Sequence, residues 1–249
     1  MELKNEKEAI IDLLKKEGLK IIQRSDYFNF SLDSLLIAEF LTITKNTKKI
    51  VDLGTGNGSI PLFLSKRTKA HITGFEIQDV SADLAKRNIA LNNLENQISI
   101  VHDDMKNWRN HIQPCSQDAV ITNPPFFKYT GNEELLNDLN QLTLARHEIT
   151  INLDQLISTA AGLLKDRGGY FAMVHRPDRL VDIIETMKKY SIEPKKLRFC
   201  HSKIGKNAKM ILIEGVKNGS PGGLNIFSPL FSHDETGKYS KEVLDMFEG

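Results

Sequence analysis

The sequence predicts a doubly wound α/β domain with a mostly parallel sheet, and three observations lead to this prediction. Apolar runs that suit buried strands alternate with segments of helical period through most of the 249 residues, as in βαβ units. A glycine-rich turn follows the first core run, at the place where such folds bind ligands. Further along, two strand-like segments joined by a short turn suit an antiparallel hairpin at the sheet edge.

The individual elements follow from the hydrophobic periodicity. The run Ile50 to Leu53 is short and ends at the glycine turn, which favours a strand. Val80 and Leu84 are spaced as on one face of a helix. We expect seven strands at 49–53, 71–77, 97–102, 117–122, 170–175, 196–202 and 209–214, and core helices at 59–67, 79–92, 152–165 and 177–190.

The first 45 residues are expected to form a short N-terminal cap on a domain that spans 46–249. Within the cap, 10–14 has a helical pattern, and 32–42 has the spacing of a second amphipathic helix. The polar segment 127–148 has the length of a functional loop, and we expect it to be a mobile lid.

Composition favours a soluble cytoplasmic protein. No apolar stretch approaches the roughly 20 residues that span a bilayer, and the charged N-terminus is unlike a secretory signal. Cys115 and Cys200 form neither a disulfide framework nor a zinc spacing, as is usual in a reducing compartment. We therefore expect no membrane association and no metal, and no obligate protein partner is evident.

Six cationic residues gather between Lys195 and Lys209, with no Asp or Glu among them, although the net charge is only +1. Such a cluster suits a phosphate backbone, and it equally suits a lysine-protected edge strand. Charge alone favours neither interpretation. If the partner is RNA, the expected contacts include Lys195, Lys196, Arg198, Lys203 and Lys206.

The glycine turn predicts a cofactor other than a dinucleotide. Gly54, Gly56 and Gly58 follow a Gly-x-Gly-x-Gly spacing, which differs from the Gly-x-Gly-x-x-Gly of dinucleotide sites. Asp52 would repel a pyrophosphate but suits a cationic amino-acid tail. These features favour S-adenosylmethionine over NAD.

Two further strand ends complete this expected site. Glu76 ends the second strand and can accept hydrogen bonds from ribose hydroxyls. Asp104 follows the third strand and can accept from an adenine amino group, beside the Met105 amide. Asp103 leaves this contact ambiguous by one position, and Asp104 is favoured. The expected cofactor residues are Asp33, Asp52, Gly54, Thr55, Gly56, Gly58, Glu76, Ile77, Asp104, Met105 and Asn123.

The segment Asn123-Pro124-Pro125-Phe126 after the fourth strand suits a clamp for a planar amino group. The lone pair of such a group is delocalised, which makes it a poor nucleophile. The Asn123 side-chain oxygen and the Pro124 carbonyl can accept its two N–H bonds and favour a pyramidal nitrogen. Phe126 can stack on a base, a contact of about 1–3 kcal/mol. Together with the cofactor pattern, this predicts methyl transfer to an exocyclic or amide nitrogen.

On these motifs the chain resembles Rossmann-like class I methyltransferases of the amino-methylating branch. Within that branch it is similar to bacterial tRNA adenine-N6 methyltransferases that modify adenosine 37 of a valine tRNA. The resemblance places Asp33 and Ser34 near the cofactor. It makes Arg146 and His147 candidates for RNA contact, and we add Lys128 and Phe126. The matching segments are 28–36, 52–62, 123–126, 145–148, 229–230 and 239–243.

Other functions are compatible with the same motifs. A glutamine amide of a peptide-release factor presents the same chemical problem, although enzymes of that kind usually carry a larger N-terminal domain. A guanine-N2 rRNA methyltransferase and a DNA adenine methyltransferase are further alternatives. A non-catalytic RNA-binding module that responds to S-adenosylmethionine is the alternative from a different class.

Overall fold

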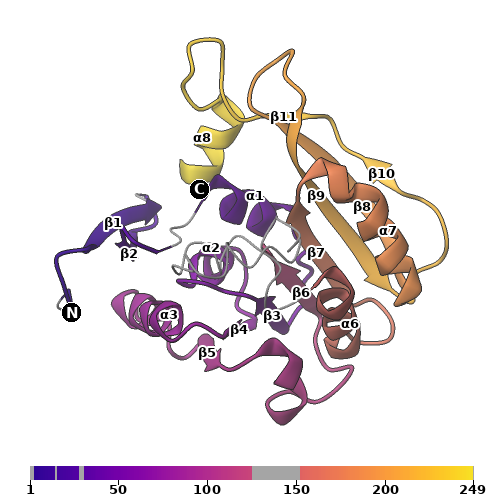
Figure 1. The fold of residues 1–249 in the computed structure, drawn as a ribbon, viewed down its shortest axis with the longest axis horizontal. Helices are drawn as coiled ribbons and strands as arrows, with labels where there is room; N and C mark the ends of the chain where they lie inside the picture. Colours follow the sequence, from indigo (N-terminus) through magenta and orange to yellow (C-terminus); the bar gives the residue numbers. More distant parts are fainter. Residues whose placement is uncertain (1–2, 15, 28–30, 125–151, 249) are drawn as a thin grey trace, which may run out of the picture.

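The computed structural model describes residues 3–14, 16–27, 31–124 and 152–248, and these form an α/β fold around one large sheet (Figure 1). The described part of the sheet has nine strands, of which β10 and β11 are two residues long. The order is β10-β8-β9-β7-β6-β3-β4-β5, with β11 also paired to β8. The strands are β3 (Lys49–Leu53), β4 (His71–Glu76), β5 (Ile98–His102), β6 (Ala119–Thr122), β7 (Tyr170–His175), β8 (Ile192–His201), β9 (Ala208–Lys217), β10 (Asn225–Ile226) and β11 (Leu230–Phe231).

The predicted fold class is confirmed, although the described sheet has nine strands where seven were expected, because the two short strands β10 and β11 also pair with β8. The pairs formed by β3 through β7 are parallel, and β9 runs antiparallel to both β7 and β8. The helices are α1 (Leu32–Phe40), α2 (Ser59–Arg67), α3 (Asp79–Leu91), α6 (Leu153–Leu163), α7 (Leu180–Lys189) and α8 (Lys241–Glu248), with 3-10 turns η1 (Met105–Asn110) and η2 (Pro177–Arg179). None of these helices combines the length and apolarity needed to cross a membrane.

Side chains alternate between two cores because successive strand residues face opposite sides of the sheet. Ile50 and Ile121 join the core that includes α1 and α2. Val51 and Val120 join the core that includes α6 and Trp108 of η1. Helices therefore cover both faces of the sheet, and the site can form at the carboxyl ends of its parallel strands.

The structure corrects the prediction for 10–14. These residues belong to a strand, β1 (Glu8–Leu14), which pairs antiparallel with β2 (Leu19–Arg24) in a separate two-stranded sheet. The β-branched Ile10 and Ile11 suit a strand, and Gly18 adopts the left-handed φ of +66° that helps the chain reverse. The apolar run was too short to distinguish the two periods.

The cap helix α1 is attached firmly to the sheet. It contributes buried leucines to the same core as α2. Just beyond it, Thr42 donates to the Glu214 carboxylate of β9 from its backbone N–H and its hydroxyl, at 2.6 Å each. Lys196 of β8 lies 3.3 Å from the same buried carboxylate. The division into a cap at 1–45 and a domain at 46–249 stays a prediction, and the expected lid at 127–148 falls outside the described residues.

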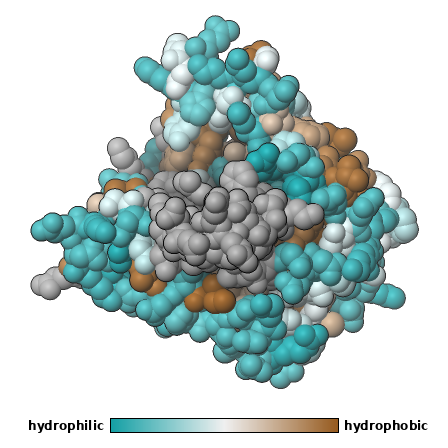
Figure 2. Space-filling model, in the orientation of Figure 1, coloured by the Kyte–Doolittle hydropathy of each residue, from teal (hydrophilic) through white to brown (hydrophobic). Residues whose placement is uncertain are grey.

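The hydropathy of the face shown in Figure 2 is mixed. Its described surface is mainly hydrophilic, with hydrophobic atoms gathered in a few places. Among the described residues, exposed apolar side chains near β10 include Leu224, Ile226 and Phe227.

Candidate functional site

The parallel register brings the predicted cofactor and acceptor residues to one edge of the sheet. Leu53 at the end of β3 pairs with Phe75 of β4 and with Thr122 of β6. The chain therefore leaves β3 into the glycine turn beside Glu76 on one side and Asn123 on the other. Thr122 reinforces this junction because its hydroxyl donates to the Leu53 carbonyl at 2.8 Å.

The glycine turn has a backbone that only glycine adopts without strain. Gly54, Gly56 and Gly58 have φ values of +76°, +57° and +83°. At Gly58 a Cβ atom would also lie 3.4 Å from the Ala85 backbone of α3. The backbone N–H groups of Gly54 and Thr55 both donate to the Phe75 carbonyl, at 3.0 and 2.9 Å. The turn is thus held closely against β4.

Glu76 supports the same turn from the end of β4. Its carboxylate accepts from the Gly56 amide at 2.9 Å and from the Gln78 amide at 2.8 Å. Burial raises the pKa of Glu76. The oxygens keep further lone pairs, so this carboxylate can both hold the turn and accept from a ligand.

Asp52 is the least satisfied polar group of the site. Its side chain is 0% exposed, and neither carboxylate oxygen has a hydrogen-bond partner among the described residues. Burial, with a smaller contribution from the nearby Glu76 carboxylate, raises the pKa of Asp52 to about 7, although the nearby Thr55 hydroxyl acts in the opposite direction. The Thr55 hydroxyl and the Asn57 amide nitrogen are likewise buried, and neither has a hydrogen-bond partner within the described ranges. A cationic, hydrogen-bonding ligand would complete this polar cradle.

The end of β5 supplies the third predicted position. Asp104 begins η1 by accepting from the Lys106 amide at 2.9 Å, and its other oxygen lies 2.9 Å from Lys106 Nζ. Asp103 is occupied differently: His111 lowers its pKa, with Nε2 2.7 Å from Oδ2, and Asn107 donates at 2.9 Å. Both carboxylates have partners within the chain, so the choice between them stays a prediction.

Met105 is placed beside the turn. A Cβ at Gly54 would lie 3.8 Å from the Met105 side chain. The ends of β3 and β5 therefore approach each other on either side of β4, as the cofactor prediction requires. Ile77 is exposed directly after Glu76.

The acceptor corner is partly described. Asn123 is half-buried, and its Nδ2 lies 3.4 Å from the Ser34 hydroxyl of α1. Pro124 is buried behind it. Asp33 is half-buried beside Ser34, and burial raises its pKa. Pro125 and Phe126 lie outside the described residues, as do Lys128, Arg146 and His147.

The five cationic candidates between Lys195 and Lys206 fall into two groups. Lys195 donates to the Ser220 carbonyl at 2.6 Å, Lys196 pairs with Glu214, and Arg198 lies 2.7 Å from Glu242 of α8. The side chains of these three residues therefore make contacts that stabilise the fold. Lys203 and Lys206 lie in the turn between β8 and β9 and have no ion-pair partner among the described residues.

The β8–β9 turn and the glycine turn lie at the same end of the sheet, where the parallel strands have their carboxyl ends. In β9, Ile211 pairs with His175 at the end of β7, and Met210 pairs with Cys200 near the end of β8. The turn therefore extends beyond the carboxyl ends of the parallel strands. Lys203 and Lys206 are thus on the side of the molecule where Asn123 lies.

The sequence reasoning missed Asn88, and it expected Ser34 near the cofactor without predicting its contact with Asn123. The contact from Ser34 to Asn123 joins positions 89 residues apart. Asn88 of α3 donates to the Asn57 carbonyl in the glycine turn at 2.9 Å. In the described ranges, no group of three His, Cys, Asp or Glu side chains could hold a metal ion.

Comparisons with known proteins agree with this arrangement. A family model described as the methyltransferase small domain matches residues 30–191. A tRNA1(Val) (adenine(37)-N6)-methyltransferase of Porphyromonas gingivalis is 32% identical over 202 residues, covering 80% of this chain and 77% of that protein. A protein of the same name from Photobacterium profundum is 28% identical over 188 residues, covering 74% and 75%.

Solved structures support the fold. A predicted O-methyltransferase from Agrobacterium tumefaciens superposes with a TM-score of 0.67 at 21% identity, covering 86% of this chain and 95% of that one. The hMettl16 catalytic domain, in complex with an RNA hairpin, has a TM-score of 0.62 at 16% identity, covering 86% and 79%. At these identities the likeness concerns the fold alone.

Proposed function

Because the chain belongs to the methyltransferase small domain family, and within it to the tRNA1(Val) (adenine(37)-N6)-methyltransferases, we propose that it methylates N6 of adenosine 37 in a valine tRNA. The proposed methyl donor is S-adenosylmethionine. The observation that carries this proposal is the buried Asp52 carboxylate, which has no hydrogen-bond partner in the part of the chain that the structure describes and lies one strand away from Asn123. A tRNA substrate also places the enzyme in the cytoplasm.

The residues present fit this cofactor. S-adenosylmethionine supplies an electrophilic methyl group on its sulfonium when bound, and it carries an ammonium group as well. Asp52 offers the ammonium a buried counter-charge, and the open backbone at Gly56 allows close approach. Glu76 would accept from the ribose hydroxyls. Asp104 and Met105 would contact the adenine, while Asp33 lies near the acceptor corner.

Asn123 prepares the acceptor nitrogen. Its Nδ2 faces Ser34, so Oδ1 is the atom left to accept an N–H of the substrate. The Pro124 carbonyl would accept the second N–H, which directs the nitrogen lone pair toward the methyl carbon. No residue with a tuned pKa has to remove a proton before transfer, because positioning lowers the barrier. Phe126 and Pro125 would complete the clamp.

The β8–β9 turn supports docking of RNA next to this clamp. Lys203 and Lys206 would contact phosphates, whereas Lys195, Lys196 and Arg198 contribute mainly through the fold. We retain Lys128, Arg146 and His147 as further proposed contacts. An adenine in an anticodon loop must leave its stack to reach the pocket, and single-stranded loops permit this at low cost.

Methyl transfer to purified RNA tests the proposal. A valine tRNA transcript should accept labelled methyl groups, a transcript with guanosine at position 37 should not, and nucleoside mass spectrometry should identify N6-methyladenosine. The Asn123→Ala variant should lose about a hundredfold or more of the rate while its affinity for S-adenosylhomocysteine stays within a few-fold.

The alternatives give different results in the same assay. Methylation of a release factor but not of tRNA would establish the glutamine-amide function. Transfer to ribosomal RNA would point to guanine-N2 chemistry. Tight tRNA binding without transfer to any acceptor would indicate a binding module.

A further inference from the structure

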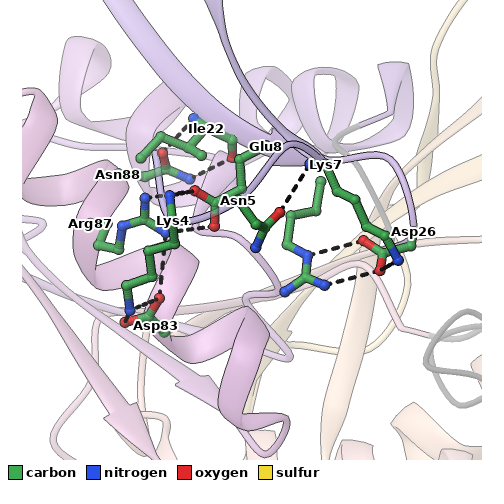
Figure 3. A network of polar contacts seen from close by, with 10 residues as sticks. Lys4, Asn5, Lys7, Glu8, Ile22, Asp26, Asp83, Arg87 and Asn88 are labelled. Atoms are coloured by element: carbon green, nitrogen blue, oxygen red, sulfur yellow. Dashed lines mark hydrogen bonds and ion pairs between the residues drawn. The ribbon is translucent and has the colours of Figure 1, made fainter. Parts of the chain in front are cut away.

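Asn88 of helix α3 and Asn92, the residue that caps its C-terminus, both face the edge of β2 (Figure 3 shows Asn88). The Ile22 amide donates to Asn88 Oδ1 at 2.6 Å, and Asn88 Nδ2 donates back to the Ile22 carbonyl at 3.2 Å. The Lys20 amide donates to Asn92 Oδ1 at 2.9 Å, and Asn92 Nδ2 donates back to the Lys20 carbonyl at 2.7 Å. Each side-chain amide therefore bonds to β2 as a neighbouring strand would.

The spacing of the two pairs explains why this ladder forms. Four residues of a helix rise about 6 Å, and two residues of a strand rise about 6.6 Å. Asn88 and the C-cap residue Asn92 therefore match Ile22 and Lys20 on β2, respectively. A carboxamide has one acceptor and a donating NH2, so it can satisfy both backbone groups of the residue opposite. The ladder covers the otherwise open edge of β2.

Only one of the two asparagines reaches the cofactor turn. Asn88 is 0% exposed, and its Nδ2 also donates to the Asn57 carbonyl at 2.9 Å. Asn92 instead donates to the Asn88 carbonyl of its own helix at 2.7 Å. The residue Asn57 lies between Gly56 and Gly58, so Asn88 joins β2 directly to the turn expected to hold the cofactor.

Ion pairs fasten the rest of this N-terminal hairpin to the same helix (Figure 3). Arg87 donates to both Glu8 oxygens at 2.8 Å, and these side chains are only 11% and 2% exposed. Lys4 lies 2.9 Å from Asp83. The hairpin is therefore docked on α3 at several points, and Asn88 is the point that also contacts the glycine turn.

We propose that Asn88 is a positioning residue that couples docking of the hairpin β1–β2 to the conformation of the cofactor turn. This inference rests on the proposed function. Asn88 touches no expected ligand atom; it holds the Asn57 carbonyl and thereby the backbone of Gly56 and Gly58. Because coupling between two binding events is reciprocal, the cofactor should in turn stabilise the docked hairpin.

A matched pair of variants separates coupling from ordinary stability. Asn88→Asp keeps an acceptor for the Ile22 amide but loses the donor to Asn57, and Asn92→Asp makes the same change on the Lys20 pair. Both variants should unfold at lower temperature. Affinity for S-adenosylhomocysteine, measured by calorimetry well below both transitions, should fall about tenfold in Asn88→Asp and less than about twofold in Asn92→Asp.

The kinetic signature is specific as well. Asn88→Asp should raise KM for S-adenosylmethionine about as much as it weakens S-adenosylhomocysteine binding, while kcat at saturation stays within about twofold. Equal affinity losses in the two variants, or no loss in Asn88→Asp, would overturn the coupling.

Hydrogen exchange in the unmodified protein tests the reciprocal effect, even if Asn88→Asp fails to fold. Saturating S-adenosylhomocysteine should slow exchange at the Ile22 amide by about tenfold and slow the Lys20 amide less. No slowing at Ile22, although calorimetry shows binding, would overturn the coupling and leave the proposed function intact. Absence of any binding to the unmodified protein would overturn the cofactor assignment together with the coupling.

Discussion

Asn123 Nδ2 lies 3.4 Å from the Ser34 hydroxyl, so the cap helix α1 contacts the proposed catalytic amide directly. The two residues are 89 positions apart and meet because α1 packs across the sheet beside β6 and β7. In the structure the carboxamide nitrogen is turned toward Ser34. The carboxamide oxygen is then the atom that can face a substrate amino group.

Removing the Ser34 hydroxyl should therefore slow methyl transfer without weakening cofactor binding. We expect Ser34→Ala to lower kcat about tenfold, because the Asn123 amide loses the partner that orients it. Steady-state kinetics and S-adenosylhomocysteine calorimetry measure the two effects separately. Adding Ser34→Ala to Asn123→Ala should cause no further loss; additive losses would show that Ser34 acts independently of Asn123.

The pKa of Asp52 predicts a pH-dependent affinity. In the free protein burial raises this pKa to about 7, but a cationic ligand requires the ionised carboxylate. Affinity for S-adenosylhomocysteine should fall about tenfold as the pH falls from about 8 to about 6. The Asp52→Asn variant should bind S-adenosylhomocysteine weakly, and its affinity should depend less on pH. Any pH dependence that remains in this variant would come from Glu76. An unchanged slope in Asp52→Asn would contradict the assignment.

The raised pKa of Asp52 also affects the stability of the ligand-free protein. The folded state holds the Asp52 proton more tightly than the unfolded chain does, so stability is greatest at low pH for this group. The free energy of unfolding should lose this contribution as the pH rises from about 4 to about 7. Denaturant titrations of the ligand-free protein and of Asp52→Asn measure the difference.

Charge reversal in the β8–β9 turn should weaken tRNA binding. The double variant Lys203→Glu, Lys206→Glu should reduce affinity by about tenfold or more at moderate salt and lower the salt dependence of binding. The control is Lys45→Glu, Lys69→Glu, which changes the same charge at two exposed lysines near the amino ends of β3 and β4. Equal losses in both double variants would indicate a nonspecific effect of net charge.

The ion pair between Glu8 and Arg87 should contribute stability that acid removes. The hydrogen bonds from Arg87 lower the pKa of Glu8 to about 2, from 4.5 for an unperturbed glutamate. This contribution is complete above about pH 4.5 and is lost as the pH falls towards about 2. Glu8→Gln should be less stable at neutral pH and should lose less stability over the acid range. Parallel acid titrations of the two proteins would contradict this role.

The positions of the acidic residues at the strand ends could be predicted because each is marked by residues that are its neighbours in the sequence. Asp52, Glu76 and Asp104 each follow an apolar run, and parallel strands bring their carboxyl ends to one edge. The glycine spacing added the position of the turn. These observations involve neighbours in sequence, and they were sufficient to predict the fold class and that these residues gather at one end of the sheet.

Contacts between distant segments could not be predicted in the same way. In the sequence, Lys196 and Arg198 looked equivalent to Lys203. In the fold, Lys196 forms an ion pair with Glu214 and Arg198 forms one with Glu242. Asn88 looked like an ordinary polar position on an amphipathic helix. Its role depends on β2, which the sequence reasoning did not predict because the first apolar segment is short.

The buried Glu214 limits how a substrate can enter. Thr42 and Lys196 both hold this carboxylate, so swinging α1 outward would remove the two hydrogen bonds from Thr42 and leave the buried anion with Lys196 alone. The first helix is therefore held in place beside the proposed catalytic asparagine. A substrate nucleotide that reaches Asn123 would meet this helix as a rigid surface.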